Sequence, residues 1–292
     1  MEDKVVAAML GLALVLAPAV ASAQAQRIRV GGVERRYLVH VPPVGGRTPD
    51  AIVVVLHGGG GTPAGIAAHT RFNRLADGER FVVAYPAARN GRWLDGREGS
   101  EAGDDITFLR ALVDTLRRRH GIRAERVFAA GISNGAMMSY RLACEAPSTV
   151  GAIGIVAGGM PAGLERGCGG TAALPVVVLH GTDDRLVPFG GGRGVLGIAA
   201  SLGPWLARAR CNGPGAASIT DRVRDGTVVE HVAYSGCTAP IELYTIRGGG
   251  HTWPGGPRVR AKILGRTTRE VAATDLLWRF FDRAVPPAER AP

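Results

Sequence analysis

Ser133 is the residue of this chain whose type and setting most directly suggest nucleophilic chemistry. It lies in the pentapeptide Gly-Ile-Ser-Asn-Gly, residues 131–135, after an apolar run and before a segment of helical character. The pattern G-x-S-x-G exposes a serine hydroxyl when a strand, a tight turn and a helix surround it, and its glycines leave room where strand and helix crowd together. Glycine makes up 43 of the 292 residues, so the pattern can also arise by chance. Other residues are therefore needed to decide whether Ser133 is a nucleophile.

A serine nucleophile needs a base and a group that orients this base. Among the seven histidines, His251 lies in the glycine-rich stretch RGGGHTWPGG after the last apolar run, and we expect it to be the base. Asp183 and Asp184 directly follow the run PVVVLHGT, and the spacing allows either of them to orient the imidazole. The resulting chain order of serine, aspartate and histidine is the order found in α/β-hydrolases.

Two backbone N–H groups would stabilise the oxyanion that forms when a serine attacks a carbonyl carbon. We expect the first from Asn134, at the start of the helix that follows the serine. The second should come from HGGGG, residues 57–61, because glycine lets the backbone approach the substrate oxygen. Within this run Gly59 is our choice, with Gly60 as the alternative.

These residues need a scaffold that brings the ends of several apolar runs to one edge. From about residue 51 onward, apolar runs alternate with helical segments, which predicts an α/β fold with a mostly parallel central sheet and helices on both faces. Ligand sites in such sheets lie beyond the carboxyl ends of the strands. His57 and His180 also end apolar runs and should lie near this edge. We expect strands at 51–56, 81–86, 127–130, 150–158, 175–181 and 241–246, helices at 63–77, 104–120, 134–144 and 269–284, and a preceding hairpin at 27–42 that turns at Gly31 and Gly32.

The first residues have the features of an export signal. Val5 to Ala17 is an apolar stretch too short to span a bilayer, and the small residues Ala21-Ser22-Ala23 follow it. We expect a signal peptide over residues 1–23, with cleavage after Ala23 or after Ala25. The protein would then be secreted or periplasmic, without stable membrane association after the signal is removed; an uncleaved, membrane-tethered N-terminus is the alternative. Because no linker or composition break divides residues 24–292, we expect them to form a single α/β-hydrolase catalytic domain.

Four cysteines follow the signal region, and an even number in an exported protein favours disulfides. The spacing suggests the pairs Cys144–Cys168 and Cys211–Cys237, while buried free thiols are the alternative. None of them forms a C-x-x-C pattern, so we expect no metal site.

The net charge of +10 could attract nucleic acid or acidic polymers. The arginines are scattered, however, and the densest run, residues 117–120, reads as the end of a helix, where cations complement the helix dipole. We therefore expect no nucleic-acid partner.

Four segments together resemble the poly(3-hydroxybutyrate) (PHB) depolymerase-like esterases, a family that includes secreted feruloyl esterases. They are LHGGGG, RVFAAGISNGAMMSYRLACE, HGTDDRLVP and GGGHTWPGG, and the likeness runs from about residue 35 to residue 282. The resemblance implies an α/β-hydrolase fold and serine-dependent cleavage of carboxylic esters without a metal or other cofactor. The family pattern H-G-T-x-D-x-x-V-P places the acid on Asp184 rather than Asp183. Family cysteines in similar places support the disulfide pairs suggested above.

The chain departs from secreted depolymerases of the crystalline polyester, which add a linker and a substrate-binding domain that this sequence does not show. We therefore expect its partner to be a soluble or polymer-linked ester: a hydroxycinnamoyl or acetyl group on plant polysaccharide, or a short hydroxyacid oligomer. No long insertion precedes PVVVLHG, so no large lid is expected. Trp93 and Trp253 are candidate platforms for an aromatic or sugar ring, with ordinary packing as the alternative. The segment from Cys211 to Cys237 is expected to wall one side of the groove.

Two other readings remain open from the sequence. A serine peptidase of the same fold would use the same residues, and a non-catalytic polymer-binding protein could retain a hydrolase scaffold. The acyl and alcohol specificity and the oligomeric state are not predicted.

Overall fold

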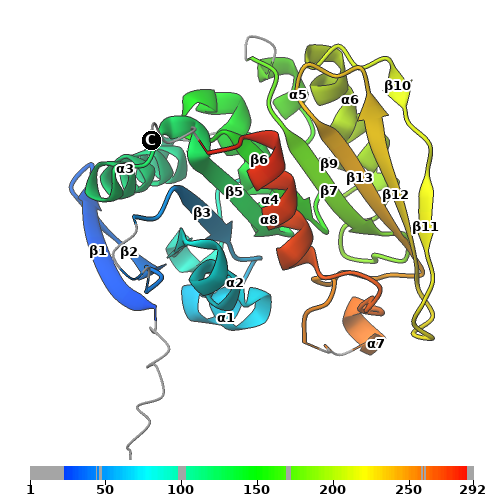
Figure 1. The fold of residues 1–292 in the computed structure, drawn as a ribbon, viewed down its shortest axis with the longest axis horizontal. Helices are drawn as coiled ribbons and strands as arrows, with labels where there is room; N and C mark the ends of the chain where they lie inside the picture. Colours follow the sequence, from blue (N-terminus) through cyan, green and yellow to red (C-terminus); the bar gives the residue numbers. More distant parts are fainter. Residues whose placement is uncertain are drawn as a thin grey trace, which may run out of the picture.

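The computed structural model describes residues 23–43, 45, 48–97, 103–168, 172–257, 259 and 261–287. The apolar run of residues 51–56 forms strand β3 at the centre of a sheet. Strands of the described part follow the order β1-β2-β4-β3-β5-β6-β7-β13-β12-β10, and β11 pairs with β12. Figure 1 shows this sheet crossing the molecule. The strands are β1 (Gln24–Val30), β2 (Val33–His40), β3 (Ala51–Leu56), β4 (Phe81–Pro86), β5 (Val127–Ile132), β6 (Ala152–Val156), β7 (Val176–Gly181), β10 (Gly213–Pro214), β11 (Ser218–Thr220), β12 (Val228–Ser235) and β13 (Ile241–Arg247).

The central strands β4, β3, β5, β6, β7 and β13 are parallel, and antiparallel strands extend both edges. This confirms the predicted α/β-hydrolase arrangement. The predicted hairpin also forms, with Gly31 and Gly32 at positive φ (55° and 79°) between β1 and β2. Outside the main sheet, β8 (Gly191–Gly192) and β9 (Val195–Leu196) make a small two-stranded pair.

Helices cover both faces of the sheet, because each central strand presents apolar side chains to both sides. In β3, Val54 and Leu56 pack with α3, α4 and α6, whereas Val53 and Val55 pack with α1, α2 and α8. The helices are α1 (Pro63–Thr70), α2 (Phe72–Glu79), α3 (Gly103–His120), α4 (Asn134–Glu145), α5 (Leu164–Gly167), α6 (Ile198–Arg208), α7 (Ala261–Leu264) and α8 (Ala273–Ala284), with 3₁₀ turns at Arg89–Gly91, Ala124–Arg126 and Pro147–Thr149.

Two predicted elements differ in detail. The helix expected at 63–77 is divided into α1 and α2, because Arg71 adopts the left-handed conformation (φ 58°) and ends the first helix. The segment from Cys211 to Cys237 extends the sheet through β10, β11 and β12.

The predicted signal peptide lies almost entirely outside the described residues, and the single catalytic domain over 24–292 stays a prediction. In the part of the chain that is described, no helix combines the length and apolar character needed to cross a bilayer.

Candidate active site

Ser133 occupies a sharp turn between β5 and α4. Its backbone has φ 57° and ψ −124°, a conformation that a serine rarely adopts. A Cβ on Gly131 would lie 2.4 Å from the carbonyl carbon of Gly135, and a Cβ on Gly135 would lie 2.3 Å from the carbonyl oxygen of Leu56. The turn therefore requires glycine at both positions, which confirms the predicted crowding of strand and helix.

Asn134 begins α4, so its backbone N–H belongs to the first turn, where amide groups have no acceptor within the helix. Its side chain is buried and holds a second segment. The amide oxygen accepts from the N–H of Trp93 (2.8 Å), and the amide nitrogen donates to the carbonyl of Trp93 (2.9 Å) and to Asp95 Oδ2 (2.5 Å). The side chain of Asn134 thus fixes the loop after β4 against the serine turn, a role that we did not predict.

A buried ion pair supports the same loop from the other side. Asp105 accepts from Arg35 Nη2 (2.6 Å) and from the N–H of Leu94 (2.9 Å). Arg141 on α4 also donates to the carbonyl of Leu94. Asp105 lies within α3 and acts there as a buried partner of Arg35.

The glycine run after β3 lies next to the serine turn. The N–H of Gly60 donates to the carbonyl of Gly91 (2.8 Å), and that of Gly61 donates to Gly58 (2.9 Å). A Cβ added to Gly59 would approach Asn134 at 3.9 Å. Because Gly60 already uses its N–H within the protein, Gly59 is the better placed of the two candidate donors.

His251 and Asp184 are brought together from loops 67 residues apart. The distance between His251 Nδ1 and Asp184 Oδ2 is 2.7 Å, and both side chains are buried. The other carboxylate oxygen, Oδ1, accepts from the N–H groups of Leu186 (2.9 Å) and Val187 (2.8 Å). Asp183 is exposed and accepts from Thr182 Oγ1, so the geometry favours Asp184.

His180 lies against this pair. Its Nε2 donates to the carbonyl of Val187 (2.8 Å) and is 3.5 Å from Asp184 Oδ2. Complete burial lowers the pKa of His180, so the ring is held neutral. Its position four residues before Asp184 at the end of β7 was visible in the sequence, but only the fold places it next to the acid.

His57 has a supporting position at the same edge. The N–H of Ala88 donates to its Nε2 (3.2 Å), so Nδ1 carries the proton and donates to the carbonyl of Gly58 (2.8 Å). Burial lowers the pKa of His57, which agrees with a neutral ring. With both nitrogens bonded to the backbone, His57 braces the glycine run and is not available as a base.

Ser133 and His251 face one pocket of about 580 Å³, which Gly59 and Asn134 also line. None of the lining residues in the described part of the chain is acidic. The walls come from five separate regions of the chain: residues 57–69, Arg92 with Arg97, residues 132–137, 186–187, and 251–264.

Trp93 and Trp253 are not platforms for substrate, which corrects the prediction. Each side chain is only 1% exposed. Trp93 donates from Nε1 to the carbonyl of His57 (3.0 Å), and Trp253 donates to Thr274 Oγ1 (3.1 Å). Both indoles pack into the core beneath the site, because apolar rings of this size are stabilised by burial when their N–H has a partner.

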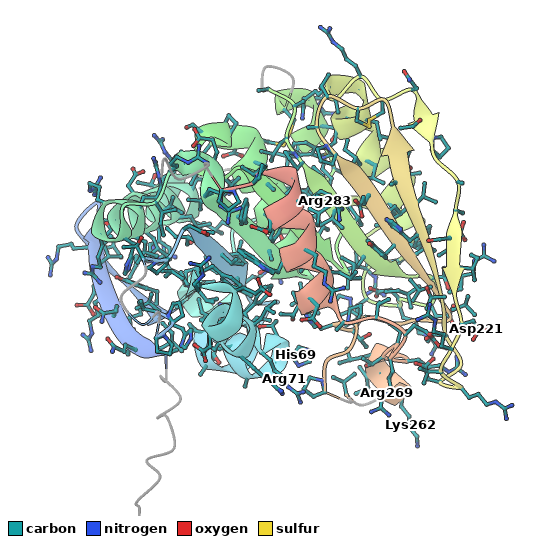
Figure 2. All side chains as sticks on the ribbon, viewed as in Figure 1. His69, Arg71, Asp221, Lys262, Arg269 and Arg283 are labelled. Carbon is teal, nitrogen blue, oxygen red and sulfur yellow. A yellow bond between two sulfur atoms is a disulfide. The ribbon has the colours of Figure 1, made fainter. Side chains whose placement is uncertain are left out.

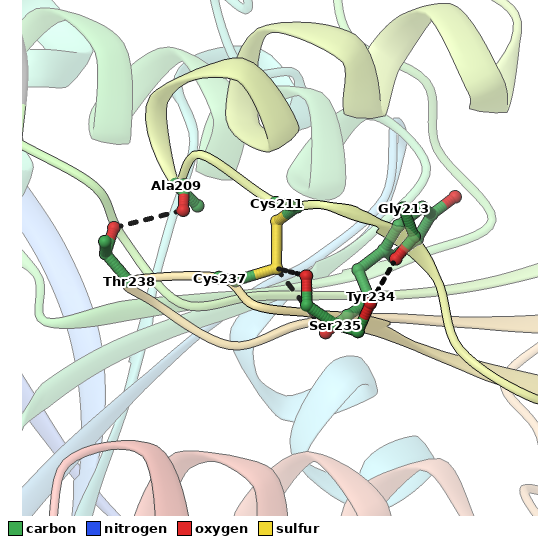
Figure 3. The surroundings of a disulfide bond; sticks show 7 residues. All are labelled: Ala209, Cys211, Gly213, Tyr234, Ser235, Cys237 and Thr238. Carbon is green, nitrogen blue, oxygen red and sulfur yellow. Dashed lines mark hydrogen bonds between the residues drawn. A yellow bond between two sulfur atoms is a disulfide. The ribbon is translucent and has the colours of Figure 1, made fainter.

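Both disulfides form as the spacing suggested, and the described part of the chain has no free cysteine. Cys144, near the end of α4, pairs with Cys168 after α5. Cys211 pairs with Cys237 at the outer edge of the sheet, where Ser235 donates to Gly213 and Thr238 to Ala209 (Figure 3). The central pocket has no lining residue from this segment; Val223, Arg224 and Asp225 of the segment line a smaller cavity beside it, so the segment walls this neighbouring space rather than the central pocket.

Comparison with known proteins agrees with this architecture. A family model described as "Esterase PHB depolymerase" matches residues 35–178. The chain is 29% identical over 283 residues to "Putative esterase NocK" of Nocardia uniformis, covering 87% of this chain and 81% of that protein. It is 26% identical over 209 residues to feruloyl esterase C of Emericella nidulans, covering 70% and 66%. Among solved structures, an acetyl xylan esterase from Aspergillus awamori superposes with a TM-score of 0.61 at 16% identity, covering 78% of this chain and 94% of that one.

The fold and the comparisons define an α/β-hydrolase that acts on carboxylic esters. Within this class, residues 35–178 match the family model of PHB depolymerase esterases, so this part of the chain is similar to the family that its motifs resemble.

Proposed function

We propose that this protein is a secreted serine esterase that forms an acyl-enzyme on Ser133. The observation that carries the proposal is the bond between His251 and Asp184 at the wall of the pocket that contains Ser133. Because His251 donates from Nδ1 to the carboxylate, its Nε2 is left unprotonated and can accept the serine proton.

In the proposed reaction, Ser133 Oγ attacks the ester carbonyl while His251 Nε2 takes the hydroxyl proton. His251 then returns this proton to the leaving alcohol, and the acyl group remains on the serine. A water molecule releases the acyl group by the same two steps. Asp184 keeps the imidazole in the required tautomer and stabilises its charged form. Three hydrogen bonds, from His251 Nδ1 and from the N–H groups of Leu186 and Val187, hold the Asp184 carboxylate in one orientation.

The oxyanion of the tetrahedral intermediate is assigned to the backbone N–H groups of Asn134 and Gly59. Support comes from the position of Asn134 in the first turn of α4, where the helix dipole favours negative charge. The hydrogen bond from Gly60 to Gly91 supports Gly59 as the second donor. Both groups are fixed before substrate binds, so they need no reorganisation during the reaction.

The substrate classes proposed are hydroxycinnamoyl or acetyl esters of plant polysaccharide and short polyhydroxyalkanoate-type polyesters. Relatives named feruloyl esterase C and an acetyl xylan esterase structure support the first class. Two disulfides support a location outside the reducing cytoplasm, either secreted or periplasmic. We propose no metal, other cofactor or nucleic-acid partner.

The proposal is tested by initial rates on methyl ferulate, an aryl acetate, an aryl butyrate and amorphous PHB. For Ser133→Ala we expect a loss of about 10³-fold or more on every ester that the wild type hydrolyses, because the nucleophile itself is removed. Ser148→Ala is the matched control, since Ser148 is exposed and lies at the amino edge of the sheet, where residues 147–149 precede β6. Mass spectrometry of a slowly hydrolysed aryl ester should find the acyl group on the peptide that contains residue 133. Substantial activity in Ser133→Ala would reject the mechanism.

A further inference from the structure

Two smaller cavities adjoin the active-site pocket, one on each side. His69 lines both the central pocket and a cavity of about 370 Å³ beside α1 and α2. Val259 lines both the central pocket and a cavity of about 260 Å³ beside residues 223–225 and 265–269. Each side cavity therefore shares a wall residue with the central pocket that Ser133 lines, and we refer to the three adjacent spaces together as the groove.

Arginines line both ends of this groove. Arg71 and Arg74 line the first side cavity, and Arg224, Arg266 and Arg269 line the second. All five are exposed. None of them forms an ion pair with a carboxylate of the described residues, whereas many other arginines of the chain do. Figure 2 shows His69 and Arg71 by α1 and α2, and Lys262 and Arg269 across from them in the region of α7.

Few negative charges oppose these arginines. One carboxylate lines each side cavity, Asp275 in the first and Asp225 in the second. Asp225 already accepts from the N–H and hydroxyl of Thr227 (2.9 and 2.6 Å) and from the N–H of Arg269 (2.6 Å). Its oxygens are thus directed toward its own loop, and the groove retains an excess of positive charge.

We propose that the groove binds a carboxylate-bearing polysaccharide, so that the natural ester is carried on an acidic rather than a neutral glycan. This inference rests on the proposed function and adds the charge of the polymer. Cationic subsites on both sides of the nucleophile would bind negative groups on both sides of the scissile ester. A uronic acid polymer provides such groups at intervals along its chain, whereas a hydroxyacid oligomer has a single terminal carboxylate. Guanidinium groups match carboxylates in shape and hydrogen bonding.

The test compares two soluble polymers with the same degree of acetylation, acetylated polygalacturonate and acetylated glucomannan. We expect a lower KM for the acidic polymer. Raising NaCl from 50 to 500 mM should increase that KM severalfold and leave the KM for the neutral polymer unchanged, because salt screens exposed charges. Two double variants remove the charge at one end of the groove each: Arg71→Asn with Arg74→Gln, and Arg266→Gln with Arg269→Gln. Each variant should raise the KM for acetylated polygalacturonate by about fivefold at similar kcat. Asparagine is chosen at position 71 because it tolerates positive φ.

The matched control is Arg118→Gln with Arg119→Gln. These exposed residues lie at the end of α3, which precedes β5 and therefore sits at the opposite edge of the sheet. All of these arginine variants should hydrolyse an aryl acetate at the wild-type rate, which distinguishes the groove proposal from the proposed serine mechanism. Activity of Ser133→Ala on the aryl acetate would instead reject the proposed serine mechanism. The groove proposal alone is overturned if active enzyme shows no preference for the acidic polymer, or if neither end affects its KM. It is also overturned if DNA of equal charge concentration inhibits aryl acetate hydrolysis while unesterified polygalacturonate does not.

Discussion

Single side chains at the carboxyl edge of the sheet show how similar residues acquire different roles. Three histidines follow strands there, and their hydrogen bonds distinguish them. His57 uses both ring nitrogens on backbone groups, and His180 donates to Val187 beside the acid. His251 alone among the three bonds a carboxylate through Nδ1 at 2.7 Å. The environment supplied by the fold, rather than the residue type, thus selects the base.

The buried neutral histidines predict how stability depends on pH. Burial lowers the folded-state pKa of His57 and of His180 below the ordinary value of 6.5. When the pH falls below about 6.5, the unfolded chain therefore takes up protons that the folded chain does not yet bind. We expect the free energy of unfolding to be highest above that pH and to fall between pH 6.5 and 5.5, by up to about 1.4 kcal/mol per pH unit for each histidine.

Urea denaturation at pH 7.5, 6.5 and 5.5 measures this dependence. His180→Gln should show a shallower decrease than the wild type, because one of the histidines with a lowered pKa, a group that also includes His69 and His120, no longer titrates. A free energy of unfolding that stays constant or rises as the pH is lowered over this range would contradict the expectation.

Residue-level prediction succeeded where a position has a steric or chemical requirement. The glycines at 131 and 135 could be predicted because any Cβ there meets backbone atoms. The tryptophans could not, because an indole beside a catalytic motif looks the same in the sequence whether it faces solvent or the core. Spacing also could not choose between Asp183 and Asp184; the family pattern did, and the loop geometry agrees.

At the scale of elements, the apolar runs predicted the central strands because these strands are buried on both faces. The strands at the outer edge were missed. In β12 most residues are only partly buried, and the polar residues Glu230 and His231 interrupt the apolar ones, so the segment lacks a continuous apolar run. The division between α1 and α2 was also missed, because the left-handed residue is an arginine and carries no glycine signal.

The two disulfides close loops of similar length but lie at different distances from the serine turn. They span similar separations, 24 and 26 residues, so loss of either should reduce the free energy of unfolding by about 3 kcal/mol through loop entropy. Their positions differ, because Cys144 lies on α4, whose first turn follows Ser133, while Cys211 and Cys237 lie at the far edge of the sheet.

We therefore expect the double variant Cys144→Ser with Cys168→Ser to lower kcat on an aryl acetate severalfold. The variant Cys211→Ser with Cys237→Ser should keep the wild-type kcat. Urea denaturation and initial rates on the same preparations measure both effects. Equal losses of kcat in the two variants would show that the pocket depends on the outer edge of the sheet.

For the whole molecule, the alternation of strands and helices was enough to predict the fold class and the edge at which the site lies. The specificity of the groove was not predictable, since five separate segments line the central pocket and only the folded chain brings them together. The net charge of +10 likewise did not indicate a binding surface from the sequence alone, whereas the structure gathers exposed arginines at both ends of one groove.

The sheet also bears on where the proposed signal peptide would be cleaved. Strand β1 starts at Gln24, which pairs with Val39, and Ala25 pairs with Leu38. Cleavage after Ala23 leaves this edge strand whole, whereas cleavage after Ala25 removes its first two paired residues. We therefore predict that intact-mass analysis of protein from the culture medium or periplasm will find Gln24 as the first residue. A chain beginning at Gln26 would show that these two pairs are dispensable, and an uncleaved chain in the membrane fraction would contradict export by a removable signal.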